Sequence, residues 1–385
     1  MTKSFRTAYV LLPLLALAAG AQTGMTPAEI SIQKAQQEIA KNPRHYPYYN
    51  GLAMAYARRA RETSDVRYYA KAEETLETSL AIAPGNFEAL KVRTWLALGR
   101  HEFAKARSMA AELNKQVPDD VTVYGYLVDA NAELGNYAEA VDAAQWMLNL
   151  RPGNVAGLTR AGYLRELHGD LSGALEMMQM AYDSTPFQEK EDRAWLLTQM
   201  AHLYLLSSDL SHAEMYASDA LGLFPDYHYA LGALAQVRVA QKRYADAASL
   251  LEKRYRQAPH AENLYALANA LELAGRHEEA AQAGAKFERI SLAESGVADN
   301  SNHELIAYYI GAGKNAGKAL EIAQREVARR HDVYTLDAYA CALAANGKYA
   351  EADAQMRKAL AVGVKDPTVL AHAREIAGHL AGAAE

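Results

Sequence analysis

The chain has 385 residues, of which half are apolar and 22% are charged, and its formal net charge is −6. This composition is typical of a folded protein and excludes a disordered chain. Lys and Arg are scattered through the sequence without a basic stripe or block, so the sequence predicts no nucleic-acid partner.

Residues 1–21 have the pattern of a secretory signal peptide. Lys3 and Arg6 supply a positively charged start, an apolar run follows, and Ala19–Ala21 supplies the small residues of a cleavage site. The apolar run is shorter than the ~20 residues that span a bilayer, so cleavage is favoured over an uncleaved anchor. The cleavage site lacks the cysteine of a lipoprotein. We therefore expect a mature chain that begins at Gln22 and is periplasmic or secreted, with membrane contact only through the signal peptide.

Residues 22–42 are predicted to form an N-terminal helix. The segment Thr26–Glu29 has the pattern of a capping box with proline at the first helical position, and it opens a helix that runs to Lys41. The aromatic cluster His45–Tyr49 follows. It is interpreted as a staple between this helix and the next element, with a docking site as the alternative.

A repeat of about 34 residues organises most of the chain. Successive prolines are separated by 34 residues in four gaps and by 39 in one, at Pro84, Pro118, Pro152, Pro186, Pro225 and Pro259. Each lies twelve residues after an alanine, at Ala72, Ala106, Ala140, Ala174, Ala213 and Ala247. A fixed period of this length indicates a stacked repeat architecture that grows by adding units to one continuous core.

Each unit contains two amphipathic helices. In the unit that ends at Pro152, an apolar segment around Leu127 ends at Gly135, and a second segment begins at Tyr137 with apolar residues at helical spacing. Gly135 suits a sharp turn, and the proline marks the end of the second helix. Small residues recur twelve positions before the second-helix alanine, where they let paired helices approach closely, at Gly162, Ala201, Ala235, Ala268, Ala307 and Ala340.

These motifs resemble the tetratricopeptide repeat (TPR), whose units carry a small residue at position 8, glycine near 15, alanine at 20 and proline at 32. The resemblance implies an all-α, right-handed solenoid of about nine helix-turn-helix units over residues 43–366. The last three position-20 alanines are Ala280, Ala319 and Ala352. Thr94 and Val128 depart from the pattern at position 8, which should loosen packing locally without changing the architecture.

Three insertions break the period. The first adds about seven residues around 58–67, the second is a charged stretch of five extra residues before Asp192, and the third adds five within 291–302, which is predicted to be a polar loop. Residues 367–385 are predicted to form a C-terminal capping helix and tail, which such arrays need to cover their last unit.

The sequence predicts neither an enzyme nor a cofactor. It contains no phosphate-binding loop, nucleophile elbow or paired-cysteine spacing, and its one cysteine, Cys341, cannot form an intramolecular disulfide. His372, Glu375 and His379 share a helix face and could supply three metal ligands. The favoured interpretation of that face is a polar surface of the capping helix, with a metal or enzymatic site as the less favoured alternative.

The resemblance implies a concave groove lined by the first helices at positions 2, 5, 9 and 12. In this chain those positions give a predicted partner-binding set: Lys91, Trp95, Tyr163, Glu166, Trp195, His202, Tyr229, Gln236, Tyr265, Asn269, Glu304, Tyr308 and Tyr334. Seven of the thirteen are aromatic, and aromatic side chains give large contact areas at small entropic cost. Packing against neighbouring helices is the alternative role for these aromatics. The Lys–Asn pair with which some TPR domains hold a C-terminal carboxylate is absent from this set.

The predicted function is therefore a non-catalytic scaffold or adaptor that binds a peptide or protein partner in an aromatic groove and is itself a monomer. The alternative is a structural subunit of an envelope complex that assembles through its convex face or the ends of the array.

Overall fold

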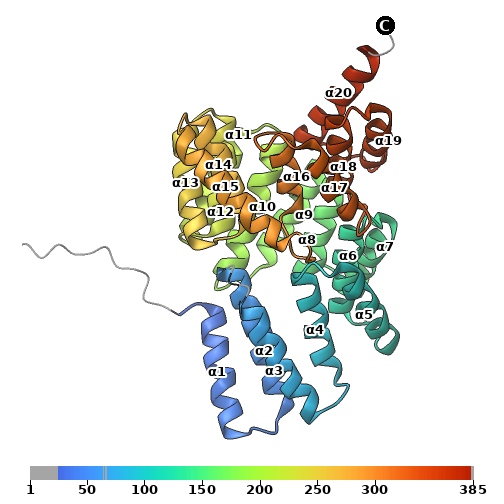
Figure 1. The fold of residues 1–385 in the computed structure, drawn as a ribbon. Coiled ribbons are helices and arrows are strands. Elements are labelled where there is room, and N and C mark those ends of the chain that lie inside the picture. Colours follow the sequence, from blue (N-terminus) through green and yellow to red (C-terminus); the bar gives the residue numbers. More distant parts are fainter. Residues whose placement is uncertain (1–24, 64, 66, 383–385) are drawn as a thin grey trace, which may run out of the picture.

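The computed structural model describes residues 25–63, 65 and 67–382, and this part of the chain folds into twenty α-helices with no strand (Figure 1). The predicted signal peptide, residues 1–21, lies outside the described residues. Within the described residues, no helix is both long enough and apolar enough to cross a membrane.

Nine helix pairs follow one another along the chain, as predicted. Their first helices are α2 (Tyr46–Thr63), α4 (Phe87–Gly99), α6 (Val121–Leu134), α8 (Val155–Leu167), α10 (Lys190–Leu206), α12 (His228–Ala240), α14 (Ala261–Leu273), α16 (Asn302–Ile310) and α18 (Val333–Ala345). Their second helices are α3 (Arg67–Ile82), α5 (Phe103–Gln116), α7 (Tyr137–Leu150), α9 (Leu171–Ser184), α11 (Leu210–Leu223), α13 (Tyr244–Gln257), α15 (His277–Glu294), α17 (Ala316–Val327) and α19 (Tyr349–Leu360). The array is flanked by α1 (Pro27–Lys41) and α20 (Pro367–Gly382).

The repeated alanines form the contact between paired helices. All nine second-helix alanines are buried, eight of them completely and Ala280 with 7% of its surface exposed. Thr94 and Val128, the two larger residues at the first-helix position, are also buried, at 0% and 1% exposure. The residues that recur every 34 positions are therefore those that pack in the core of each helix pair.

The eighth unit departs from the predicted register. Ala307 is exposed rather than packed between helices, and Ile306 is buried in its place at 1% exposure. The physical reason is the connection after α16: residues 311–315 make it five residues long, whereas the turns after α6 and α8 are two and three residues long. The longer turn displaces α16 along its neighbours, so the twelve-residue spacing from Ala319 no longer identifies the core residue.

The third insertion is shorter as a loop than predicted. Helix α15 continues to Glu294, so Ser291 lies in a helix and is fully buried. Its hydroxyl is 2.7 Å from that of Ser301, and this contact ties the end of α15 to the start of α16. Part of the expected polar loop is therefore helix.

Both ends of the array are capped by side chains. Thr26 and Glu29 form the predicted capping box at the start of α1. At the other end, Asp366 accepts hydrogen bonds from the amides of Thr368 and Val369, at 2.7 and 3.2 Å, and so caps α20. In the turn after α1, the Tyr49 hydroxyl donates to the carbonyl of Pro43, which agrees with a local staple.

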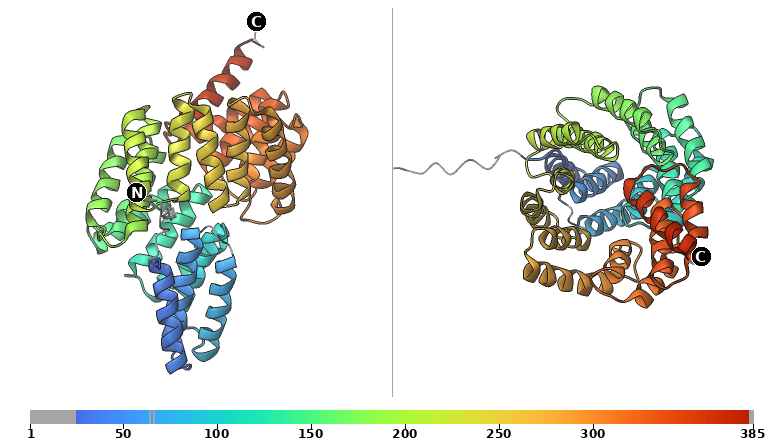
Figure 2. Two further views of the ribbon diagram at one scale, coloured as in Figure 1. Left: turned by 90° about the vertical axis from the view of Figure 1, so that its left-hand side faces the viewer. Right: turned by 90° about the horizontal axis from the view of Figure 1, so that it is seen from above.

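The helix pairs wind into a superhelix whose successive turns touch. Figure 2 shows the later units as a ring around an axis, with the first units beneath it. The turn after α6 lies against the segment before α18: the His331 amide donates to the Leu134 carbonyl at 3.2 Å, and the Val333 amide donates to the Tyr137 hydroxyl at 2.9 Å. Residues almost 200 positions apart are thereby joined.

Candidate functional site

The concave side of the superhelix contains a cavity of about 540 Å³ lined mainly by α8 and α10. Tyr163 of α8 and Trp195 of α10, both in the predicted groove set, line it together. Both are only partly buried, so their rings are accessible from the cavity. Neighbouring first helices bring them together because consecutive units stack side by side.

The charged groups around this cavity are paired with one another. The Arg160 guanidinium contacts the Asp129 carboxylate at 2.5 Å, and Arg61 contacts Asp192 at 2.5 Å. The aromatic rings of Tyr163 and Trp195, together with the aliphatic side chains of Val155 and Leu196, supply apolar surface in the cavity. An apolar or aromatic side chain of a ligand would fit there without displacing an ion pair.

A second group of predicted residues meets beside Tyr163. Glu166 is buried and lies 3.0 Å from Nε2 of His202. Burial lowers the pKa of His202, but the hydrogen bond and the charge of Glu166 outweigh that effect, so the net shift is upward. Tyr334, from the ninth unit, packs on the same apolar cluster as Tyr163. The winding of the superhelix thus joins groove positions that are distant in sequence.

A larger cavity of about 690 Å³ lies between α16, α18 and α20. Glu304 and Tyr334 of the predicted set line it. Burial, and then the nearby Glu262 carboxylate, raise the pKa of Glu304 to about 7. His303, Ala307 and Ile310 of α16 also line it, whereas Tyr308 of the predicted set does not.

The remaining predicted residues are dispersed. Trp95 packs on two core clusters, and Tyr265 and Tyr308 both contact the ring of Phe287, with centroid distances of 5.0 and 5.6 Å. For these three aromatics the structure places the side chain between helices, which is the alternative role considered from the sequence.

Lys91 pairs with Asp120 at 2.8 Å, and Tyr229 is 37% exposed beside Tyr227. Gln236 and Asn269 are exposed. The partner-binding role of the set as a whole stays a prediction.

One polar cluster was missed because it joins two insertions that are far apart in the sequence. Arg61 from the first insertion contacts Glu191, at the end of the second insertion, and the adjacent Asp192, and the Tyr227 hydroxyl donates to Glu191 at 2.6 Å. Glu191 is fully buried. The only signal in the sequence was that both insertions are rich in charge, which does not reveal that they meet.

The capping helix brings its histidines to different places. His372 Nδ1 lies 3.0 Å from both carboxylate oxygens of Asp337 on α18, and Cys341 is beside them. His379 stacks on the ring of Tyr349, with a centroid distance of 4.6 Å. Glu375 lines the larger cavity with them. The three residues His372, Glu375 and His379 therefore do not converge on one point as a helix-face site would require.

The repeat is also recognised by comparison with known proteins. A family model described as tetratricopeptide repeat matches residues 94–155, 127–189 and 233–291. Together with the nine helix pairs, this match decides the family. The chain is a tetratricopeptide repeat protein.

Solved structures of TPR-type solenoids resemble this TPR protein in fold. The APC/C hetero-tetramer Cut9–Hcn1 aligns with a TM-score of 0.54 and 11% identity over 90% of this chain, which spans 59% of that chain's length. The human IFIT1 dimer with PPP-AAAA aligns with a TM-score of 0.54 and 13% identity over 86% of this chain and 85% of its own. At these identities the likeness concerns the fold alone. No curated protein matches the sequence.

Proposed function

We propose that this TPR protein is a non-catalytic scaffold that binds an extended or helical segment of a partner protein on its concave side. The observation that carries the proposal is the joint lining of one 540 Å³ cavity by Tyr163 and Trp195. Aromatic anchors of this kind supply most of the binding energy in protein interfaces. A groove lined by successive first helices suits a ligand that runs along it.

The interior charges favour a protein partner over a nucleic acid. Glu133 lies 3.2 Å from Arg330, and burial, followed by repulsion from Asp332, raises its pKa to about 7. Glu166 and Glu304 add two more carboxylates on the concave side. These acidic groups do not form the basic surface on which nucleic-acid binding depends.

The test is a double substitution, Tyr163→Ala with Trp195→Ala, in the mature chain. Partners captured from an extract of the native cell envelope would be identified by mass spectrometry, and the captured segment would be titrated as a purified peptide. We expect micromolar binding by the unaltered chain and at least about tenfold weaker binding by the double variant, a loss of about 1.4 kcal/mol. Helicity should be unchanged.

Trp146→Ala is the matched control. Trp146 lies on α7, is 52% exposed and stacks on Tyr124 outside the cavity. Its replacement removes an exposed tryptophan ring outside the cavity and should leave binding unchanged. If the double variant and the unaltered chain bound the peptide with equal affinity, partner binding in this cavity would be ruled out.

Assembly through the convex face is the second candidate function. Trp146 on α7, Met180 on α9 and Met215 on α11 are 52%, 43% and 46% exposed. We propose a monomer, so light scattering should give the mass of one chain. A larger assembly that Trp146→Ala dissolves would favour the convex-face alternative.

We further propose that the protein acts in the periplasm or outside the cell. The support is the signal-peptide pattern of residues 1–21. Mass spectrometry of the protein from its native cell should give a chain beginning at Gln22. A chain that retains Met1 would contradict cleavage of the signal peptide.

A further inference from the structure

Three different metal-binding side chains meet where the last unit packs on the capping helix. Asp337 and Cys341 lie one turn apart on α18, and His372 lies opposite them on α20. One ligand atom from each residue lies within 4.8 Å of the other two. A carboxylate, a thiol and an imidazole are thus gathered at one point by two helices.

The distances are close to those of a metal site. His372 Nδ1 is 3.0 Å from each Asp337 oxygen, and Cys341 Sγ is 4.0 Å from Oδ1. A tetrahedral Zn²⁺ lies about 2.0–2.3 Å from N, O and S ligands, which places the ligand atoms roughly 3.3–3.8 Å from one another. Side-chain rotations of about 1 Å would bring these three atoms to that spacing.

The surroundings leave one side of the cluster open. Asp337 is 8% exposed, whereas 35% of the His372 side chain is exposed. All three residues line the 690 Å³ cavity, together with Glu375 and His303. A bound metal would therefore have protein ligands on one side and room on the other for water or for a side chain of a bound molecule.

We propose that Asp337, Cys341 and His372 bind a divalent transition-metal ion, with the fourth coordination position open to the cavity. Zn²⁺ fits this donor set best, since thiolate and imidazole favour zinc and related ions while Ca²⁺ and Mg²⁺ require oxygen ligands. The competing role is an Asp337–His372 ion pair that docks α20 on α18. In that role the Cys341 thiol donates only a long hydrogen bond to Asp337, at 4.0 Å, and ligates no metal, so a bond from its thiolate to a metal distinguishes the two.

The test uses Co²⁺ as a spectroscopic substitute for Zn²⁺ in the full mature chain. We expect stoichiometric binding, with an absorption band from thiolate-to-cobalt charge transfer. Cys341→Ser should abolish that band and weaken binding by about tenfold or more, and His372→Gln should weaken binding similarly, because even residues that only support ligands contribute 10–100-fold. A band of unchanged intensity in Cys341→Ser, or no Co²⁺ binding by the unaltered chain, would overturn the proposal.

His212→Gln is the matched control. His212 Nδ1 lies 2.7 Å from Asp209, so it reproduces the histidine–carboxylate pair without a thiol. Its replacement should leave Co²⁺ binding unchanged.

A second measurement needs no substitution at the cysteine. Zn²⁺ should slow alkylation of Cys341 at least about tenfold in the unaltered chain and in His212→Gln, but not in His372→Gln. Equal alkylation rates with and without Zn²⁺ in the unaltered chain would also overturn the proposal.

Discussion

The regular repeats and the three insertions make different kinds of contact. Within the repeats, buried alanines such as Ala174 and Ala213 bring paired helices together, and each unit touches its neighbours. The insertions contribute charged groups that reach across the superhelix, as Arg61 does to Glu191 and Asp192. Asp299, in the third insertion, lies 3.5 Å from His101 of the second unit.

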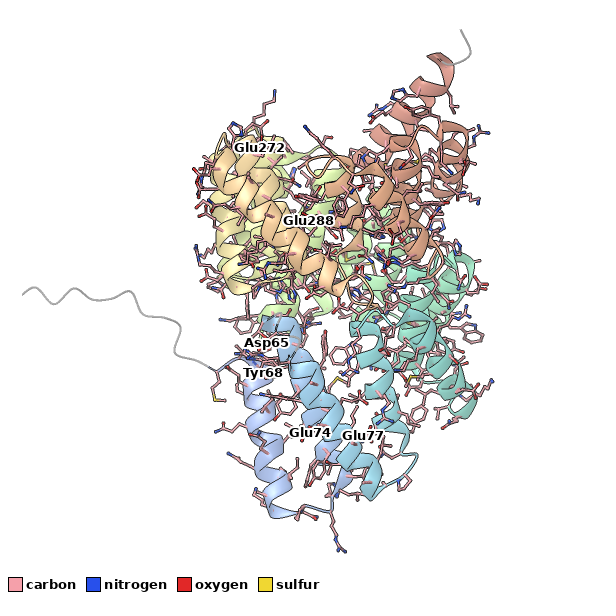
Figure 3. The ribbon with its side chains drawn as sticks, viewed as in Figure 1. Asp65, Tyr68, Glu74, Glu77, Glu272 and Glu288 are labelled. Atoms are coloured by element: carbon pink, nitrogen blue, oxygen red, sulfur yellow. The ribbon has the colours of Figure 1, made fainter. Side chains whose placement is uncertain are left out.

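The comparison shows that the repeats form the superhelix, and that the insertions join its successive turns together with the contact between the turn after α6 and the segment before α18. In Figure 3, Asp65 lies at the end of the first helix pair that is nearest the ring of later units. Glu74 and Glu77 lie on the same pair, farther from the ring. Asp65 lines a cavity together with Pro259 and Glu294 of the sixth and seventh units. A departure from the period therefore marks a tertiary contact in this chain.

Arg61→Met should have the largest effect of the changes considered, because it leaves the fully buried Glu191 without its counter-ion. Removing one partner of a buried pair costs about 3–5 kcal/mol. Denaturant unfolding should show this loss in the free energy of unfolding.

Arg93→Met is the control for Arg61→Met within the regular repeats. Arg93 pairs with Glu73 and Glu77 between adjacent units, and Glu77 is 66% exposed. Its loss should cost about 0–1 kcal/mol. Equal costs for the two arginines would contradict the distinction between repeats and insertions.

Gly135→Ala should destabilise the protein more than Gly85→Ala. Both glycines have positive φ, +82° and +73°, so each substitution costs about 1–2 kcal/mol for the left-handed backbone. A Cβ at 135 would also lie 2.6 Å from the His331 carbonyl oxygen, whereas the space around Gly85 is open. Thermal unfolding of both variants measures the difference, and identical melting temperatures would show that the turns do not touch.

The register of α16 can be tested with two equivalent alanines. Ala340→Leu introduces a large side chain at a fully buried position and should cost about 1–3 kcal/mol. Ala307→Leu falls at the same repeat position but projects from an exposed site, so we expect little change in unfolding free energy. A large loss of unfolding free energy in Ala307→Leu would contradict the shifted register and support the one that the repeat spacing predicts.

Glu304→Gln should stabilise the protein at pH 8 and have little effect at pH 4.5. The folded-state pKa of about 7 exceeds the ordinary value of 4.5, so the folded state holds the proton more tightly and loses stability as the pH rises between these values. The gain at pH 8 should be roughly 1–2 kcal/mol after allowance for solvent. Unfolding curves of the unaltered chain and the variant at both pH values measure it, and an equal effect of Glu304→Gln at both pH values would contradict the raised pKa.

The sequence predicted the fold in detail wherever the period held. Ala72 to Ala352 identified nine helix pairs, because the close approach of two helices admits only a small side chain. The prediction failed at Ala307, where a longer turn moved the helix. The sequence also did not predict the contact between the turns after α6 and α17, because a local sequence pattern contains no information on which distant units touch.

The candidate site was less accessible to sequence analysis. The position rule selected Tyr163 and Trp195, which line one cavity because both lie on first helices of adjacent units. It also selected Trp95 and Tyr265, which pack into the core. The cluster of Asp337, Cys341 and His372 depends on how α20 packs on α18, which the spacing within either helix does not encode.

Small-angle X-ray scattering of the mature chain tests most directly whether the insertions hold successive turns together. The account predicts a curve that fits the closed superhelix of Figure 2, and a clear increase in radius of gyration for the variant Arg61→Glu. An open, elongated superhelix in the unaltered chain, or identical curves for the two proteins, would contradict it.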